Sequence, residues 1–368
     1  MKNQLRKIFA IQAFNSLIVG ILFVALPLLM SERNISIVEI GLIYASLPLV
    51  FQTFRLIFAI LSDLIGRKKF FILNASLNFF TPLIYIFAFN PFQFLAGKIT
   101  EGVKSSALWS VNRASILEEA RNKEKELRRL RAISSIFQAL AILAFGFLVT
   151  FFSFPKILLI SSFISLPLFF LSLNLKSKPM KKRRLRKILS LKQKKEKFKK
   201  GLILFILLGI SIGGIDSYVL PLFLREKGIS ESLIGFLLGF QILMQGISTY
   251  EILLLGLDFK HLMFLNLAFP IFLFLLSFSP FSLIPLSLLL LGISRGLVNA
   301  GNETIISRIA GKYSYGTDIG IIFTGFHFAR ALIIAFSGFL ILFFGFSSIF
   351  ILSSLIFFLY ILLTLKFI

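Results

Sequence analysis

The sequence predicts an all-α membrane protein with twelve transmembrane helices in two pseudo-symmetric six-helix bundles. Three observations lead to this prediction: an apolar composition, twelve long apolar runs, and a repeat that relates the two halves of the chain. Of 368 residues, 57% are hydrophobic and 47 are Phe, and the mean hydropathy is +0.92. Only about 45–50% of the residues of a soluble domain are apolar, so this chain has more apolar residues than the core of a soluble protein could bury.

Each of the twelve apolar runs has close to the ~20 residues that a helix needs to cross ~30 Å of hydrocarbon. The first run is too long for a signal peptide and lacks a small-residue cleavage site, so we expect it to remain as a membrane helix. The runs cover residues 8–30, 37–61, 70–89, 92–111, 132–152, 157–175, 202–224, 232–255, 262–278, 283–301, 319–344 and 347–367.

The basic residues set the expected orientation. The formal net charge is +24, and most of the 40 Lys and Arg fall at the two ends of the chain and in the even-numbered loops. Cytoplasmic loops carry such an excess, so we expect both termini to be cytoplasmic and the protein to lie in the cell membrane. The densest basic block, residues 176–200, joins runs six and seven. We interpret it as a linker against the anionic inner leaflet of the lipid bilayer rather than as a nucleic-acid site.

The two halves of the chain repeat. Residues 25–41 align without gaps on residues 219–235, and eight of the seventeen positions are identical. Matched Leu residues arise by chance in apolar sequence, but four pairs in one register do not: Pro27/Pro221, Glu32/Glu226, Ser36/Ser230 and Gly41/Gly235. Duplication is the better account. The sequence therefore predicts an N-terminal six-helix bundle at residues 1–175, a basic linker at 176–200 and a C-terminal six-helix bundle at 201–368.

An acid, a glycine and a basic cluster stand together between runs two and three, where residues 59–69 read Ala-Ile-Leu-Ser-Asp-Leu-Ile-Gly-Arg-Lys-Lys. A tight turn requires Gly, and the bases hold the loop in the cytoplasm. The segment resembles the signature loop of the major facilitator superfamily, although Ala59 stands where Gly is usual and Leu64 where a base is usual. The pattern positions that match are Asp63, Gly66, Arg67 and Lys68.

The resemblance implies two halves that rock about a substrate site near the bilayer midplane. It also implies that an acid at the end of the fourth helix joins Asp63 and Arg67 in a charge network that locks the outward-facing state. Glu118 or Glu119 fits that position; the alternative is an acid that merely balances loop bases. We expect Asp63 to bond amides at a neighbouring helix N-terminus. The predicted gating loop comprises Asp63, Gly66, Arg67, Lys68 and Glu118.

Run four carries Lys98, Glu101 and Lys104 at intervals of three residues, which places them on one helical stripe. Each charge costs at least ~2.5–3.5 kcal/mol at the bilayer centre, which indicates a cavity rather than lipid around them. Lys98 and Glu101 resemble a fourth-helix motif of the family that is associated with proton coupling. Glu101 and, on run seven, Asp216 are the predicted proton carriers. The alternative for Glu101 is that it only neutralises the two lysines.

The charges within the central runs predict the substrate class. Four bases, Lys98, Lys104, Arg295 and Arg330, stand against Glu101 and Asp216. Because Arg offers a planar fork suited to carboxylate or phosphate, we expect an organic anion, bound between Arg295 and Arg330 with Lys104 opposite. For the amides, an interhelical hydrogen bond is the alternative role. The predicted substrate-binding residues are Lys104, Arg295, Asn299, His327, Arg330, Gln245 and Asn15.

These features predict a secondary active transporter of a small solute, coupled to a proton or another ion and working as a monomer. The alternative within this class is a hydrophobic drug exporter, although run five lacks the Gly-Pro motif of such exporters in the family. The alternative from another class is a transport-inactive membrane sensor or scaffold, which the cost of the charges within the runs disfavours. Cys is absent and there are two His, so we expect no metal site and no cofactor. The sequence lacks a nucleophile elbow and a phosphate-binding loop, so we expect no enzyme.

Overall fold

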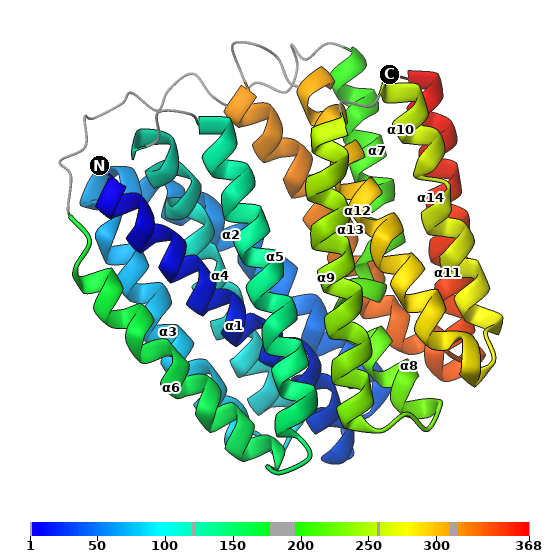
Figure 1. Ribbon diagram of the computed structural model, residues 1–368, viewed down its shortest axis with the longest axis horizontal. Helices are drawn as coiled ribbons and strands as arrows, with labels where there is room; N and C mark the ends of the chain where they lie inside the picture. The colour runs from blue at the N-terminus through cyan, green and yellow to red at the C-terminus, as the bar shows by residue number, and fades with distance from the viewer. Residues whose placement is uncertain (1, 120–122, 177–195, 256–257, 310–314, 368) are drawn as a thin grey trace.

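The computed structural model describes residues 2–119, 123–176, 196–255, 258–309 and 315–367, which form helices joined by short turns (Figure 1). The first half contains α1 Lys2–Glu32, α2 Ile37–Ile65, α3 Lys68–Ile86, α4 Pro91–Glu119, α5 Lys123–Leu148 and α6 Phe154–Leu173. The second half contains α7 Glu196–Gly213, the π-helical turn η2 Ile215–Val219, α8 Leu220–Glu226, α9 Glu231–Leu255, α10 Phe259–Leu265, α11 Ala268–Phe278, the 3-10 turn η3 Phe281–Leu283, α12 Ile284–Ile309, α13 Tyr315–Phe344 and α14 Phe346–Phe367.

Eleven helical stretches of the described chain are long and apolar enough to cross a membrane. Three of these spans combine elements: α7 with η2 and α8, α10 with α11, and η3 with α12. The twelfth is α4, which has 29 residues but carries Lys98, Glu101 and Lys104 within its length. The predicted fold of twelve spanning helices is therefore confirmed, and the chain is a multi-pass membrane protein.

The structure differs from the prediction at several helix ends. α4 continues to Glu119 and α5 already begins at Lys123, because polar helical turns extend beyond the apolar runs. α7 begins at Glu196, inside the predicted linker, and its first turn holds an ion pair of 2.8 Å between Lys200 and Glu196. Residues 177–195 lie outside the described chain, so the division into two bundles and a linker stays a prediction.

The repeat has a structural counterpart in the turns that follow α1 and α8. Asn34 and Gly228 occupy equivalent positions in the alignment, and both have a left-handed backbone, with φ of 57° and 76°. The amide of Ile35 donates to the carbonyl of Met30 over 3.0 Å, and the equivalent bond in the second half spans 3.1 Å. Matching sequence thus builds the same helix end twice, which supports duplication.

The two halves meet along two helix pairs, α2 with α13 and α5 with α9. Both chain termini lie at one end of the molecule, which we call the terminus end (Figure 1). At the opposite end, glycines bring the paired helices together: a Cβ on Gly338 would lie 2.7 Å from the carbonyl of Ile37, and one on Gly235 would lie 2.5 Å from the Cα of Gly146. η2 and α8 also pack against α1 there. The halves are therefore closed at the end opposite the termini.

Candidate functional site

A cavity of about 310 Å³ lies between the two halves. Helices α1, α2, α4 and α5 form its wall in the first half, and η2, α8, α9 and α13 form its wall in the second. Its charged lining residues among the described side chains are Lys98, Glu101 and Arg330. Its polar lining residues are Tyr44, Ser135, Gln138, Ser217, Gln241 and Gln245.

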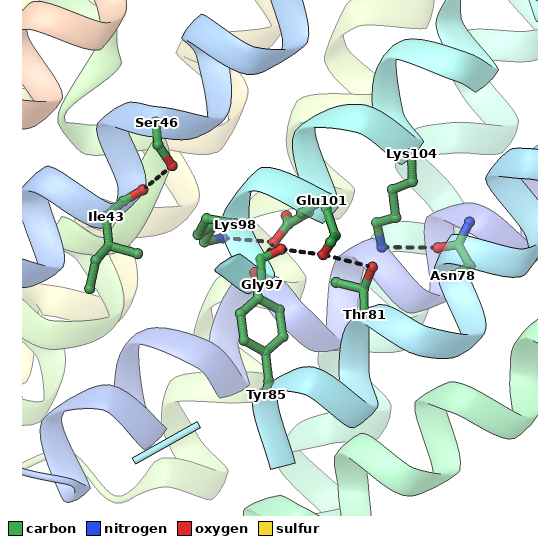
Figure 2. Close-up of polar contacts among 10 residues, drawn as sticks. Ile43, Ser46, Asn78, Thr81, Tyr85, Gly97, Lys98, Glu101 and Lys104 are labelled. Carbon is green, nitrogen blue, oxygen red and sulfur yellow. Dashed lines mark hydrogen bonds and ion pairs between the residues drawn. The ribbon is translucent and has the colours of Figure 1, made fainter. Parts of the chain in front are cut away.

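α4 supplies the charged wall of the first half (Figure 2). The ammonium of Lys98 donates to the carboxylate of Glu101 over 2.9 Å, and the hydroxyl of Tyr85 donates to the same carboxylate over 2.9 Å. The ammonium also lies 3.9 Å from the centre of the Tyr44 ring, which is a cation–π distance. Lys98 is 3% exposed and Glu101 is 9% exposed. The pair is thus buried, mutually neutralised and placed at the cavity wall.

Lys104 does not line the cavity, in contrast to its predicted place in the substrate site. Each step of three residues turns a helix by about 300°, so Lys104 lies about 120° around α4 from Lys98. Its ammonium donates to Asn78 Oδ1 over 2.9 Å inside the first half (Figure 2). Asn15 joins this interior group, because its carbonyl oxygen accepts from the amide of Asn78 over 3.1 Å. Both residues therefore serve the packing of α1, α3 and α4.

The second half brings only part of the predicted substrate set to the cavity. Arg330 and Gln245 line it. Arg295 is buried, and its guanidinium lies 5.3 Å from the ring centre of Phe269 on α11. Of the two arginines expected to hold one anion, only Arg330 is therefore among the described lining residues of the cavity.

Two further predicted residues lie near the cavity without lining it. The amide of Asn299 donates to the Thr249 hydroxyl over 3.5 Å, which is the interhelical role that the alternative gave it. The ring of His327 lies 5.1 Å from that of Phe51, between α13 and α2. Asp216 belongs to the π-helical turn η2, and its side chain lies outside what the structure describes.

The predicted gating residues come together at the terminus end. Arg67 is placed between two acids, with Nη1 2.7 Å from Glu118 and Nη2 3.6 Å from Asp63. Gly66 ends α2 with a φ of 91°, a conformation that favours glycine, and Lys68 begins α3. The network joins α2, α3 and α4 of one half. A contact between Asp63 and a helix N-terminus, and the role of the network as a gate, stay predictions.

The sequence did not reveal several cavity residues. Tyr44, Gln138 and Ser217 stand singly in apolar runs, where a polar residue equally often bonds a neighbouring helix. Tyr85 approaches Glu101 from α3, and no spacing in one sequence predicts a contact between two helices. The signal that did carry information was the pair of opposite charges in run four.

Comparisons with known proteins agree with this architecture. Three solved structures share the fold. A mutant of the nucleoside transporter NupG has a TM-score of 0.80 and 14% identity, with coverage of 99% of this chain and 98% of that chain; NupG itself has a TM-score of 0.78 and 15% identity, with coverage of 99% and 98%. The human organic anion transporter MFSD10 (TETRAN) has a TM-score of 0.71 and 14% identity, with coverage of 98% of this chain and 99% of that chain. No curated protein matches the sequence. The family model described as Major Facilitator Superfamily matches residues 8–257. Because this match covers more than half of the sequence, the chain belongs to the major facilitator superfamily.

Proposed function

We propose that this protein is a secondary active transporter that moves a small organic anion across the membrane by alternating access. The observation that carries the proposal is the cavity between the halves, which is closed at the end opposite the termini and has charged residues on both walls. Rocking of two halves about such a site is how this architecture moves a solute. A cavity of about 310 Å³ suits a small solute.

The substrate class rests on the charges of the cavity wall. The charged residues among the described lining residues are two bases, Lys98 and Arg330, and one acid, Glu101. The guanidinium of Arg330 offers a planar fork that suits a carboxylate or phosphate. The anion position proposed here thus keeps Arg330 from the expected position between Arg295 and Arg330, but not Arg295 or the opposing Lys104. The amides and hydroxyls around it suit the polar part of the solute, and a nucleoside transporter and an organic anion transporter share the fold.

Coupling to a proton or another ion gradient is assigned to Glu101, with Asp216 as the second candidate. Glu101 is the described carboxylate that lines the cavity, and its proton occupancy changes the charge balance with Lys98. We further propose a monomer in the cell membrane with both termini cytoplasmic, so that the described state opens inward. Residues 176–200 would then face anionic lipid.

The two alternatives differ in what the cavity must hold. A hydrophobic drug exporter requires an apolar site, whereas the described lining residues of this cavity include three charged and six polar ones. A transport-inactive sensor or scaffold gains nothing from ionised side chains in the membrane, which are costly there. Both alternatives predict a different outcome from the following experiment.

The test uses three solutes of nearly equal size and different charge: benzoate, benzamide and benzylamine. Each is offered, radiolabelled, to proteoliposomes with and without an imposed proton gradient. We expect gradient-dependent movement of benzoate in excess over benzamide, and none of benzylamine. A preference for benzylamine would return the drug exporter to first place. Binding without movement of any of the three would favour the sensor.

A further inference from the structure

A second group of cations lies beside the cavity, toward the terminus end. Arg55 of α2 is 3% exposed, and its guanidinium lies 4.6 Å from the centre of the Trp109 ring. Arg113 of α4 lies 5.0 Å from the centre of the same ring. Two guanidinium groups thus share one indole. Cation–π contacts lower their cost but do not neutralise their charge.

This group reaches across to the second half. The Phe51 ring lies 6.2 Å from that of Trp109 and 5.1 Å from that of His327, so three rings join α4, α2 and α13. Arg55 Nη2 donates over 3.4 Å to the carbonyl of Gly320, also on α13. Arg55 therefore lies where the halves meet, rather than within one bundle.

The group is continuous with the cavity wall. Trp109 follows Lys98 by eleven residues, which is about three helical turns, so both project from the same face of α4 about 16 Å apart. His327 precedes Arg330 on α13 by three residues, or about 4.5 Å along the axis. Arg55 and Arg113 thus continue the positive charge toward the terminus end on the wall of the first half, and His327 lies in the same direction from Arg330 on α13.

Two polar atoms in this group lack a partner among the described residues. Arg55 Nη1 and His327 Nδ1 are buried and make no hydrogen bond there. A buried donor on a charged group costs more than other unpaired groups, unless water or an anion meets it.

We infer that Arg55, Arg113 and His327 form a second anion-binding position, between the cavity and the terminus end. A carboxylate or phosphate group on its way to or from Arg330 is held there against the Trp109 ring. The inference rests on the proposed function for the identity of the anion. The presence of the position itself can be tested without any transport.

The test compares the rates at which an anionic and a cationic reagent enter the cavity. The chain has no Cys, so Gln245→Cys gives one thiol at the cavity wall. Detergent-solubilised protein is reacted with the anionic sulfonatoethyl and the cationic trimethylammonioethyl methanethiosulfonate, and each rate is divided by that of free cysteine. We expect the anion to react faster. Arg55→Gln and Arg113→Gln should each lower the anion-to-cation ratio about threefold, because each removes a unit charge from the proposed position.

Three controls isolate the position. Arg129→Gln removes a charge from the same half, but Arg129 is exposed and lies 3.9 Å from Glu126, so the ratio should not change. Arg55→Lys keeps the charge and should keep the ratio. Higher ionic strength should lower the ratio by screening. If Arg55→Gln does not fold, the anion-to-cation ratio of Arg113→Gln alone tests the position.

An unchanged ratio in Arg113→Gln and, where it folds, in Arg55→Gln would overturn the inference, as would faster entry of the cation in the parent. Because the thiol reaction needs no flux, an anion preference in a protein that moves no benzoate would uphold this position and reject the proposed function. Benzoate transport with an unchanged ratio would uphold the proposed function and reject this position.

Discussion

Lys98 and Glu101 form an ion pair of 2.9 Å across one turn of α4, and both side chains are buried at the cavity wall. The pair is neutral as a unit, so the helix carries two charges in the membrane at lower cost than either would have alone. Protonation of Glu101 would leave Lys98 as a lone cation beside the cavity. In the proposed mechanism, the protonation state of Glu101 therefore sets the charge that a solute meets at this wall of the cavity.

The first prediction concerns this pair. Glu101→Gln should abolish accumulation of benzoate driven by a proton gradient but spare the exchange of benzoate across the membrane. It should also lower the free energy of unfolding by about 3–5 kcal/mol, because Lys98 keeps a buried charge without its partner. The double variant Lys98→Met, Glu101→Gln should recover most of that stability without recovering coupling. Uptake that still concentrates benzoate in Glu101→Gln would place coupling elsewhere.

The second prediction separates two arginines that the sequence treated alike. Arg330→Gln should weaken benzoate binding at least about tenfold, because it removes a charge-assisted bidentate contact. Arg295→Gln should leave the affinity within about twofold, because Arg295 faces Phe269 instead of the cavity. Isothermal titration of detergent-solubilised protein measures both. Equal losses would mean that α12 turns Arg295 toward the solute in another state.

The third prediction concerns the Tyr44 hydroxyl, which is buried at the cavity wall and makes no hydrogen bond among the described residues. Tyr44→Phe should leave the stability of the empty protein unchanged or higher, because no bond is lost. It should reduce the thermal shift that benzoate causes, if the hydroxyl bonds the solute. Tyr85→Phe is the matched control, and it should lower stability by about 1–3 kcal/mol because Glu101 loses a donor.

The fourth prediction concerns the Arg67 network. Asp63→Asn and Glu118→Gln should each slow transport strongly, while the free energy of unfolding changes by no more than about 1 kcal/mol, because both acids are partly exposed. Asp258→Asn is the control from the corresponding loop of the second half, where Asp258 pairs with His261 at the surface. Normal transport in both test variants would remove the loop from the mechanism.

The fifth prediction concerns the closed end. A methyl group on Gly235 would meet the backbone of Gly146 at 2.5 Å, so Gly235→Ala should force α5 and α9 apart. Spin labels on cysteines placed at Asn90 and Ser282, in loops at that end, should report a longer mean distance. Gly320→Ala has open space around its added methyl and should leave the distance unchanged. No lengthening in Gly235→Ala would show that the contact relaxes locally.

The fold could be predicted because its causes are local. The sequence itself shows the length of each apolar run, the placement of bases and the matched turns around Asn34 and Gly228. The bilayer thickness fixes the length of each spanning helix. The helix ends were less certain, since polar turns of α4 and α5 continue beyond the apolar runs.

The candidate site could be predicted only in part. Lys98 and Glu101 were found because opposite charges one turn apart are a local pattern. Lys104 was misplaced because residues at intervals of three turn progressively around a helix. Arg295 was misplaced because its partner Phe269 lies on another helix, and a contact between two helices is not visible in the spacing. Contacts such as that of Tyr85 with Glu101 depend on how helices pack, and one sequence does not encode that in a readable pattern.

The π-helical turn Ile215–Val219 divides the seventh span into two pieces with different neighbours. Such turns interrupt the regular backbone ladder and often occur at functional sites. Ile215 and Ser217 line the cavity, while α8 beyond them packs against α1 at the closed end. α8 is thus connected to α7 through a π-helical turn of five residues. If that turn bends, α8 would leave α1 while the other helices stay in place, so release of a solute at the closed end would have a rate of its own, separate from the slower reorientation of a whole half.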